Sequence, residues 1–470
     1  MKPEKKMAKE IPHIFVILFF VIVAATIATY IIPAGQYARV LDETIGKTVI
    51  DPSSFKYIPN TPVGPFAMFV AIELGLIEAA NITFMIFAAF SCLYLMEKTG
   101  AIDASIAMMV NKTRRHPKYA TAIIVVLMII LSVWGSTGTL SYEEIIAFTP
   151  IFVALSIALG YDALVGVAIS VIPVGVGFAS ATVNPFTIGV AQTIAELPLF
   201  SGLGYRCVIL AVMTAYTILY VLWYARRIKK DPSKSLVSNV DYSDFTFDEE
   251  RLSTPFTLER KLSMLVLCIG VAAMGYGLIF LKWYINQVAA IFIIVSIVVG
   301  IINHWSANKI ADTLCEGLSR GVLAAMIVGI ARGILVVISQ GNILDTIIHA
   351  CVKFLEQLSL HVSAIGMLFF QNLLNFIVPS GSGQASVSMP FIIPIADLID
   401  MNRQIAVLIF QFGDGFSNLL WPTSFMVIVC AMVKIPLSSY YKWIMPFYLI
   451  SLLIQTFFIF LAIEINYGPF

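Results

Sequence analysis

Long apolar runs, separated by short polar segments, make up most of the chain. A membrane-spanning helix needs roughly 20 consecutive apolar residues. Seven runs predict such helices at residues 11–32, 79–96, 207–225, 262–281, 285–303, 321–340 and 446–463. The first run follows a lysine-rich start, but it is longer than the apolar core of about 7 to 15 residues in a cleaved signal peptide. We therefore expect it to remain as a helix of the protein.

Two more apolar stretches are interrupted by polar turns. Residues 119–160 contain two apolar arms joined at 135–139 by GSTGT, and residues 361–400 contain two arms joined at 379–386 by PSGSGQAS. Irregular backbone at membrane depth is tolerated where it is buried in protein or lines a cavity. Each stretch therefore predicts a re-entrant hairpin whose tip lies within the membrane.

Each hairpin is followed by an apolar segment that is interrupted in its middle. Residues 163–200 are interrupted by SATVNP, and residues 403–433 are interrupted by GDGFSN. Gly and Pro weaken or end helices, so both segments predict broken helices. Interrupted segments at corresponding positions of two halves are the best sequence indication of a transporter binding site. Coincidental kinks in ordinary helices would not reproduce this order.

These elements define the predicted fold class. We expect an all-α integral membrane protein of two inverted repeats, with about nine transmembrane helices, two re-entrant hairpins and two broken helices. The predicted order is a first repeat at 1–225, a soluble cytoplasmic connector at 226–261, a linking transmembrane helix at 262–284 and a second repeat at 285–470. Amphipathic stretches predict helices along the membrane interface, near 65–78, 101–113, 305–319 and 344–357.

Basic residues predict which side of the membrane each loop faces. Cytoplasmic loops collect Lys and Arg, and a cytoplasmic N-terminus places 21 of the 29 basic residues on that side. The chain is then a multi-pass protein of the cytoplasmic membrane with its C-terminus outside. The first hairpin opens to the cytoplasm and the second to the exterior. Counting each hairpin as two full spans gives thirteen spans and the same sides for the chain ends, so charge supports the sidedness more strongly than the hairpins.

The amino-acid composition agrees with a membrane protein and excludes a soluble domain and a nucleic-acid-binding protein. The 470 residues are 59% hydrophobic and 12% charged, with a mean hydropathy of +0.91, which is more apolar surface than a soluble domain buries. A formal net charge of +1 excludes nucleic acid as the main partner. The six cysteines form no C-x-x-C pair, and no Walker motif is present. We therefore expect no cofactor, with a proton or sodium as the candidate coupling ion.

Polar residues at the tips and interruptions are the predicted substrate-binding residues. Helix N-termini there offer free N–H groups to anions, and broken helices offer carbonyls to cations. A single Ser or Thr in a membrane helix more often bonds its own backbone or a neighbouring helix, whereas four clusters at four interruptions favour a binding site. The predicted residues are Ser136, Thr137, Gly138, Thr139, Ser141, Asn184 and Thr187 in the first half, and Ser380, Gly381, Ser382, Gln384, Ser386, Ser417, Asn418 and Thr423 in the second.

Four charged residues within the predicted membrane region are candidates for charge coupling or for contact with substrate charge. Asp414 lies between two glycines, where it could take a proton, lie near a sodium ion, face a cationic substrate, or serve only as a partner for Arg332. Arg332 could in turn bind a substrate carboxylate. Glu143 and Glu144 begin the return arm of the first hairpin, where they could cap the helix or contact substrate.

Four segments, taken together, resemble the YfcC family within the C4-dicarboxylate anaerobic carrier group of the ion transporter superfamily. They are GSTGTLSYEE at 135–144, GIARGI at 329–334, PSGSGQAS at 379–386 and FGDGFSNLLWPTS at 412–424. The resemblance covers nearly the whole chain. It implies an elevator-type transporter, usually a homodimer, in which a transport domain built from both hairpins and both broken helices slides against a dimerising scaffold.

The resemblance leaves the substrate and the coupling ion open. Family members are assigned to dicarboxylates, short-chain fatty acids, aminobenzoyl-glutamate or, for YfcC-like proteins, basic amino acids by arginine/ornithine-type exchange. Relatives that use sodium often carry Ser-Asn-Thr at both hairpin tips. Here the tips read STG at 136–138 and SGS at 380–382. Because they differ from Ser-Asn-Thr, the resemblance does not indicate sodium coupling for this chain.

The sequence thus predicts a secondary active transporter, either an antiporter or an ion-coupled symporter, for a small carboxylate-bearing solute. Acidic residues outnumber Arg332 at the expected site, which suits an amino acid such as arginine or ornithine better than a dicarboxylate. A transporter of C4-dicarboxylates or other organic anions is the alternative. A remote alternative is an intramembrane hydrolase with Ser417 as its nucleophile, but that chemistry needs a nearby base. A passive channel is disfavoured because inverted hairpins build one occluded site.

Overall fold

Helices make up most of the protein. The computed structural model describes residues 14–42, 47–115, 118–138, 140–246, 253–281, 283, 285–355 and 358–468. Within these residues, seven helices are long and apolar enough to cross a membrane. The helices of the first half are α1 (Ile14–Ile31), α2 (Pro65–Glu78), α3 (Ala80–Lys98), α4 (Ala101–Arg115), α5 (Lys118–Thr137), α6 (Tyr142–Ala158), α7 (Ala163–Ala179), α8 (Ile188–Ile194) and α9 (Leu203–Lys230).

The second half has a similar succession of helices. They are α11 (Leu258–Phe280), α12 (Ile285–Ile302), α13 (Ala307–Gln340), α14 (Leu344–Leu355), α15 (Leu360–Ile377), α16 (Gly381–Leu398), α17 (Arg403–Ser417), α18 (Phe425–Met432) and α19 (Leu437–Glu464). Helix-turn-helix pairs α5–α6 and α15–α16 occupy the stretches predicted as hairpins. Interrupted pairs α7–α8 and α17–α18 occupy those predicted as broken helices. The second interruption lies at 418–424 rather than at GDGFSN, because residues 413–417 continue α17.

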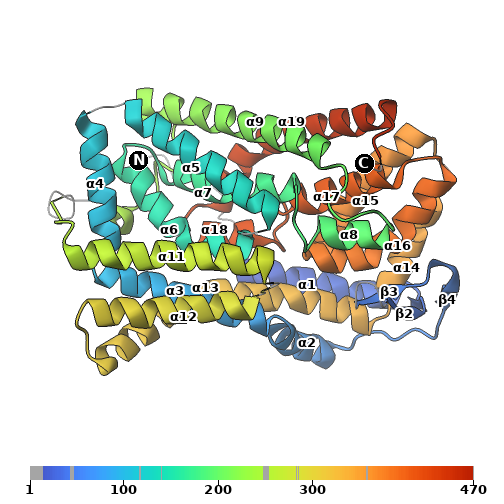
Figure 1. The fold of residues 1–470 in the computed structure, drawn as a ribbon. Helices are drawn as coiled ribbons and strands as arrows, with labels where there is room; N and C mark the ends of the chain where they lie inside the picture. The colour runs from blue at the N-terminus through green and yellow to red at the C-terminus, as the bar shows by residue number, and fades with distance from the viewer. Residues whose placement is uncertain are drawn as a thin grey trace, which may run out of the picture.

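The helices pack as two groups that lie side by side (Figure 1). In the first group, α1, α2, α3, α11, α12 and α13 pack on one another. In the second group, α5 to α9 and α15 to α19 pack on one another. Glycines allow close contact within the first group, since a Cβ on Gly75 of α2 would fall on the backbone of Gly329 and Gly333 of α13. The contact between the groups runs mainly along α3, α6, α13 and α18.

The two ends of the molecule differ in character (Figure 1). The connector end carries α4 and the polar segment between α9 and α11, and the strand end carries four short strands together with α14. The free ends of a helix pair are here the two helix ends away from the turn that joins the pair. Those of α5 and α6 lie at the connector end, and those of α15 and α16 lie at the strand end. The two turns therefore point toward each other in the middle of the molecule.

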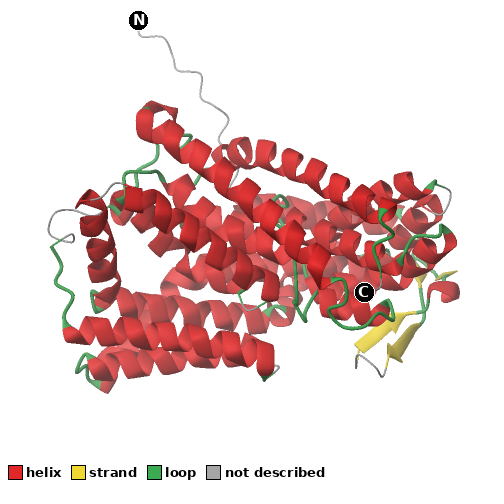
Figure 2. Ribbon diagram, turned by 45° about the horizontal axis from the view of Figure 1, so that its top comes forward, coloured by secondary structure: helices red, strands yellow, loops and turns green. Residues whose placement is uncertain are grey.

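Short strands are a departure from the expected all-α class (Figure 2). Strand β1 (Gly35–Gln36) pairs with β4 (Lys56–Tyr57), and β2 (Arg39–Asp42) pairs with β3 (Lys47–Ile50), both antiparallel. They are fixed to α14, because Asp345 accepts hydrogen bonds from the Tyr37 N–H at 3.0 Å and from the Arg39 guanidinium at 2.9 Å. Segments this short carry too little alternation for a sequence pattern to identify.

The prediction of a separate interface helix at 305–319 is wrong. These residues form the start of α13, one continuous helix of 34 residues that Ser306 caps by accepting a hydrogen bond from Lys309 N–H. Glycine in this part of α13 serves helix packing. A Cβ on Gly317 would meet the Ser91 Cα of α3 at 2.5 Å, so glycine permits the two helices to approach closely.

The polar connector is docked on the helices over much of its length. Helix α9 extends into it as far as Lys230, followed by the 3-10 turns η2 (Pro232–Lys234) and η3 (Ser243–Phe245). The Ser235 hydroxyl donates to the Asp162 carboxylate at 2.6 Å, and the Ser439 hydroxyl donates to the Leu236 carbonyl at 2.7 Å. Residues 247–252 lie outside the described part of the chain. Polarity alone did not reveal this docking.

Candidate functional site

A cavity of about 220 Å³ lies where the two hairpin turns meet. Its walls come from both helix groups. The first group contributes Glu78, Asn81, Ile82, Ile285 and Arg332. The second group contributes Gly138, Ser141, Tyr142, Glu143, Glu144, Phe178, Phe186 and Thr187 from the first half, and Pro379, Ser380, Gly381, Ser382, Asn418 and Phe425 from the second. A cavity between two packing units is a common location for a small-molecule site.

The first turn is held against the interruption of α7 by backbone and hydroxyl contacts. The Thr182 N–H donates to the Ser136 carbonyl at 2.8 Å, and the two hydroxyls lie 3.1 Å apart. Gly138 has a φ of 73°, and a Cβ there would lie 2.8 Å from Asn184 Oδ1. Both the left-handed backbone and the close contact require glycine at this position. The turn and the interruption therefore behave as one packed unit.

The second turn brings a helix N-terminus to the cavity. Helix α16 begins at Gly381, and its N-cap Ser380 makes no side-chain hydrogen bond to the helix. The first N–H groups of a helix have no partner within that helix and carry partial positive charge. Ser380, Gly381 and Ser382 all line the cavity. This turn can therefore bind a carboxylate without a cationic side chain.

Asp414 lies behind the second turn and is fully buried. Asn375 of α15 donates to Asp414 Oδ1 at 2.9 Å, while Asp414 Oδ2 has no hydrogen-bond partner among the described residues. A Cβ on Gly381 would lie 3.1 Å from Asp414 Oδ2 and 2.5 Å from the Thr187 methyl carbon. Asn375 Oδ1 and Thr187 Oγ1 are likewise buried without a partner in the described chain. Oxygen atoms thus gather beside the start of α16.

Arg332 pairs with Glu78 rather than with Asp414. The guanidinium Nε lies 3.5 Å from the Glu78 carboxylate, so the alternative that Asp414 serves only as a partner for Arg332 has no support in the structure. Glu144 accepts a hydrogen bond from the Ser141 N–H at 2.8 Å and caps α6. Glu143 also lines the cavity, and it makes no ion pair with any described residue. One acidic group is therefore available there.

The remaining predicted residues lie outside the cavity wall. Thr137 and Ser386 bond carbonyls of their own helices, at 3.0 and 2.8 Å. The Ser417 hydroxyl donates to the Gly413 carbonyl at 2.6 Å and does not face the cavity. Thr139 lies outside the described residues. The others are buried and do not line the cavity: Ser136, Asn184, Gln384, Asp414 and Thr423.

Sequence reasoning missed several residues that line the cavity. Tyr142 packs between α7 and α17, since its ring centroid lies 5.7 Å from that of Phe178 and its hydroxyl donates to the Gly415 carbonyl at 3.2 Å. It also stacks on Phe425 of α18 with ring centroids 5.3 Å apart. Glu78 and Asn81 come from the first helix group. Tyr142 stands between Ser141 and Glu143, which were both predicted site residues, so its position was a signal. Nothing in the local sequence around Glu78 indicated the cavity.

The fold and the cavity define a multi-pass membrane protein of the transporter class. The chain belongs to the C4-dicarboxylate anaerobic carrier family, DcuC, whose model matches residues 11–464. This match confirms the resemblance drawn from the four sequence segments.

Two curated proteins are similar over most of their length. The Escherichia coli protein named "Putative basic amino acid antiporter YfcC" is 33% identical over 463 residues, covering 90% of each chain. An uncharacterized Haemophilus influenzae protein is 29% identical over 489 residues, covering 94% of this chain and 95% of its own.

Two solved structures match at low identity. The YdaH transporter of Alcanivorax borkumensis is 14% identical with a TM-score of 0.46, covering 97% of this chain and 100% of its own. MtrF of Neisseria gonorrhoeae, described with a class of antimetabolite efflux pumps, is 17% identical with a TM-score of 0.43, covering 96% of this chain and 95% of its own.

Proposed function

We propose that the protein is a secondary active transporter that moves an amino acid, arginine or ornithine in type, across the cytoplasmic membrane. The observation that carries this proposal is the composition of the central cavity. It combines the N-terminus of α16 with one carboxylate, Glu143, that has no ion-pair partner among described residues. An amino acid offers one carboxylate and one cationic group, so it matches both features.

A dicarboxylate fits the same cavity less well. Its two negative charges would require two positive sites, yet Arg332, the one cationic side chain among the described wall residues, already faces Glu78. Three carboxylates, those of Glu78, Glu143 and Glu144, line the wall. Like charges in a low-dielectric site repel strongly. The name of the E. coli relative agrees with an amino acid, while the family name keeps a dicarboxylate as the second candidate.

Asp414 is the proposed coupling residue. A buried carboxylate oxygen without a partner in the described chain can hold a proton or face a small cation, and the neighbouring oxygens of Asn375 and Thr187 could complete a sodium site. Its position beside Gly381 places it behind the turn that would hold the substrate carboxylate. Ion binding and substrate binding would then share the start of α16.

Movement between the helix groups is the proposed transport step. The second group contains both hairpins and both broken helices, and the cavity lies between it and the first group. Sliding of the second group would carry the cavity from one side of the membrane to the other. The first group would then be the scaffold through which two copies of the chain form a homodimer.

Uptake into proteoliposomes tests the substrate class. We expect unlabelled arginine, ornithine or lysine to compete with labelled arginine, and succinate and fumarate not to compete. Glu143→Gln should lower the apparent affinity for arginine by roughly tenfold, about 1.4 kcal/mol, because a hydrogen bond to a charged group is lost. Glu73→Gln, an exposed acid on α2, is the matched control. Inhibition by succinate, with no effect of any amino acid, would contradict this proposal and favour a dicarboxylate as the substrate.

A further inference from the structure

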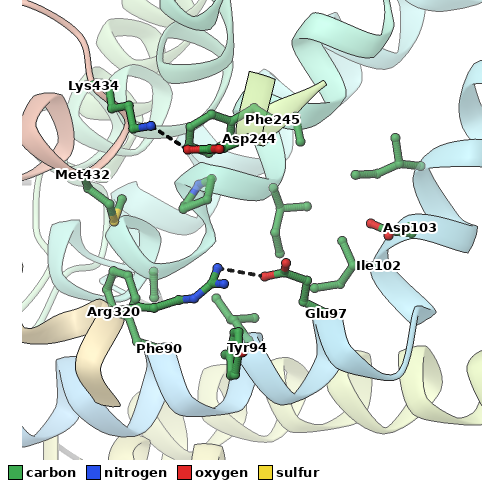
Figure 3. Close-up of a pocket in the computed structure, with 16 residues that line it drawn as sticks. Phe90, Tyr94, Glu97, Ile102, Asp103, Asp244, Phe245, Arg320, Met432 and Lys434 are labelled. Carbon is green, nitrogen blue, oxygen red and sulfur yellow. Dashed lines mark hydrogen bonds and ion pairs between the residues drawn. The ribbon is translucent and has the colours of Figure 1, made fainter. Parts of the chain in front are cut away.

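A second and larger cavity, of about 620 Å³, lies nearer the connector end. Figure 3 shows the side chains that line it. Its walls include the aromatic rings of Phe90 and Tyr94. They also include two ion pairs, Arg320 with Glu97 and Lys434 with Asp244. This volume is within the range of small-molecule sites, about 300 to 1,000 Å³. The central site does not account for this cavity.

The larger cavity follows the same helices as the central one. On α13 the central cavity is lined by Arg332 and the larger cavity by Arg320; on α18 they are lined by Phe425 and Met432. The same order holds on α3 and α6, where the larger cavity lies beside residues closer to the connector end. The larger cavity therefore lies between the central cavity and the connector end, along the contact between the two helix groups.

The two ion pairs lie on different walls of the larger cavity (Figure 3). Arg320 and Glu97, 3.3 Å apart, belong to the first helix group. Lys434 and Asp244 lie 2.5 Å apart; Lys434 follows α18, and Asp244 belongs to the docked connector. All four side chains are 41–65% exposed. Exposed ion pairs contribute only about 0.2–1 kcal/mol. A solute that carries both charges can therefore replace either partner at little cost.

Arg320 is prepared to bind a carboxylate. Its guanidinium carbon lies 4.3 Å from the centre of the Tyr94 ring, and the Tyr94 hydroxyl donates to Glu316 at 2.7 Å. These contacts fix the ring, and the ring supports the guanidinium group. A planar guanidinium group can also bind a carboxylate through two parallel hydrogen bonds. Glu97 on the neighbouring helix would meet the cationic group of the same solute.

We propose that the larger cavity is a second subsite for the transported solute, in which Arg320 binds the carboxylate and Glu97 binds the cationic group. The proposal rests on the proposed transport of an amino acid. A solute would occupy this subsite on its way between the central cavity and the connector end. The subsite therefore affects the solute on one side of the membrane only.

Sided transport assays test this subsite. In membrane vesicles of both orientations, Arg320→Gln and Glu97→Gln should each raise the KM for arginine offered at the connector end by roughly tenfold. The KM for arginine offered at the strand end should not change. Arg226→Gln removes an exposed cation at the same end of the molecule and is the control. An unchanged KM at both ends, or an equal change in KM at both ends, would contradict the proposed subsite.

Thiol protection gives a second readout that does not depend on transport. With the six native cysteines replaced, Ala154→Cys places a thiol in the wall of the larger cavity. Arginine should slow its modification by a membrane-impermeant reagent, and Arg320→Gln should remove this protection. Absence of protection in the Ala154→Cys protein that keeps Arg320 would contradict the proposed subsite. If the parent protein moves no amino acid at all, the proposed function fails instead, so the two failures are distinguishable.

Discussion

Asp414 uses its two carboxylate oxygens differently. Oδ1 accepts a hydrogen bond from Asn375, while Oδ2 lies beside Gly381 without a partner among described residues. The backbone carbonyl of Asp414 also accepts hydrogen bonds from Asn375 and Asn418, at 3.0 and 2.9 Å. The amide contacts hold the residue in place, so its ionisable group can change protonation state or cation contact without loss of the helix end.

Asp414→Asn should therefore remove ion coupling while the protein still folds. We expect the response of uptake to an imposed proton or sodium gradient to fall by at least about tenfold, corresponding to about 1.4 kcal/mol. The measurement is gradient-driven uptake of arginine into proteoliposomes, compared at several pH values and sodium concentrations.

The control for this substitution is Asp345→Asn. Asp345 is also a buried carboxylate, but it binds Arg39 at the strand end, outside both cavities. Its loss should weaken the attachment of the strands to α14 and leave coupling intact. Normal coupling in Asp414→Asn would show that Asp414 is not the coupling residue, whereas loss of expression would assign it a structural role.

Sequence identified individual residues near the cavity more readily than it identified their roles. The role of Glu144 was left open between capping and substrate contact; its bond to the Ser141 N–H confirms capping, and substrate contact stays a prediction. The partner of Arg332 could not be predicted, because Glu78 lies far away in the sequence and reaches Arg332 only through the packing of α2 on α13. Local patterns identify turns and breaks, but pairings between distant helices depend on the tertiary fold.

At the scale of helices, glycine determines how closely α5 and α7 approach. A Cβ on Gly177 of α7 would fall on the Ser132 carbonyl, and one on Gly135 of α5 would fall on the Val174 carbonyl. The contact joins the first hairpin to the first broken helix. Both glycines are needed for packing rather than for backbone freedom, because each lies within a helix.

Gly177→Ala should lower the stability of the second helix group. The added methyl group forces the two backbones apart, and overpacking costs typically about 1–3 kcal/mol. The midpoint of heat-induced aggregation in detergent should therefore fall. Gly204→Ala in α9 is the matched control, because nothing lies within 4 Å of the added carbon and alanine favours helix. An unchanged midpoint for Gly177→Ala would show that α5 and α7 can separate without cost.

Helix boundaries followed the sequence pattern closely where apolar runs had clear ends. The turn between α15 and α16, for example, covers residues 378–380 and overlaps the start of the predicted PSGSGQAS segment. The prediction failed at Gly413 and Gly415, which were taken as part of an interruption although they lie within α17 and allow close contact with Gln371 and Ala179. Glycine in a membrane helix has two roles, interruption and close packing, and only the neighbouring helix distinguishes them.

At the scale of the whole molecule, the hairpins have their free ends at opposite ends of the structure. Side-specific labelling tests whether these ends face opposite sides of a membrane. In a cysteine-free background, Tyr161→Cys, beside the free end of α6, should react with an impermeant thiol reagent from the cytoplasm. His361→Cys, at the start of α15, should react from the exterior.

Labelling of both positions from the same side would contradict the inverted arrangement and also the predicted sides of the chain ends. A third variant, Lys230→Cys at the end of α9, should label with Tyr161→Cys, because both lie at the connector end. It serves as the reference for the cytoplasmic side. Disagreement between these two would show that the connector end does not lie on one side of the membrane.

The length of α13 determines how the membrane potential acts on the solute. Arg320 and Arg332 are 12 residues apart, or about 18 Å along the helix axis, which is more than half of a hydrocarbon core of about 30 Å. If the central cavity lies at mid-depth and the larger cavity admits water, little voltage falls between them. A cationic solute would then sense most of the electric field between the central cavity and the strand end, and that half of its path would make transport voltage-dependent.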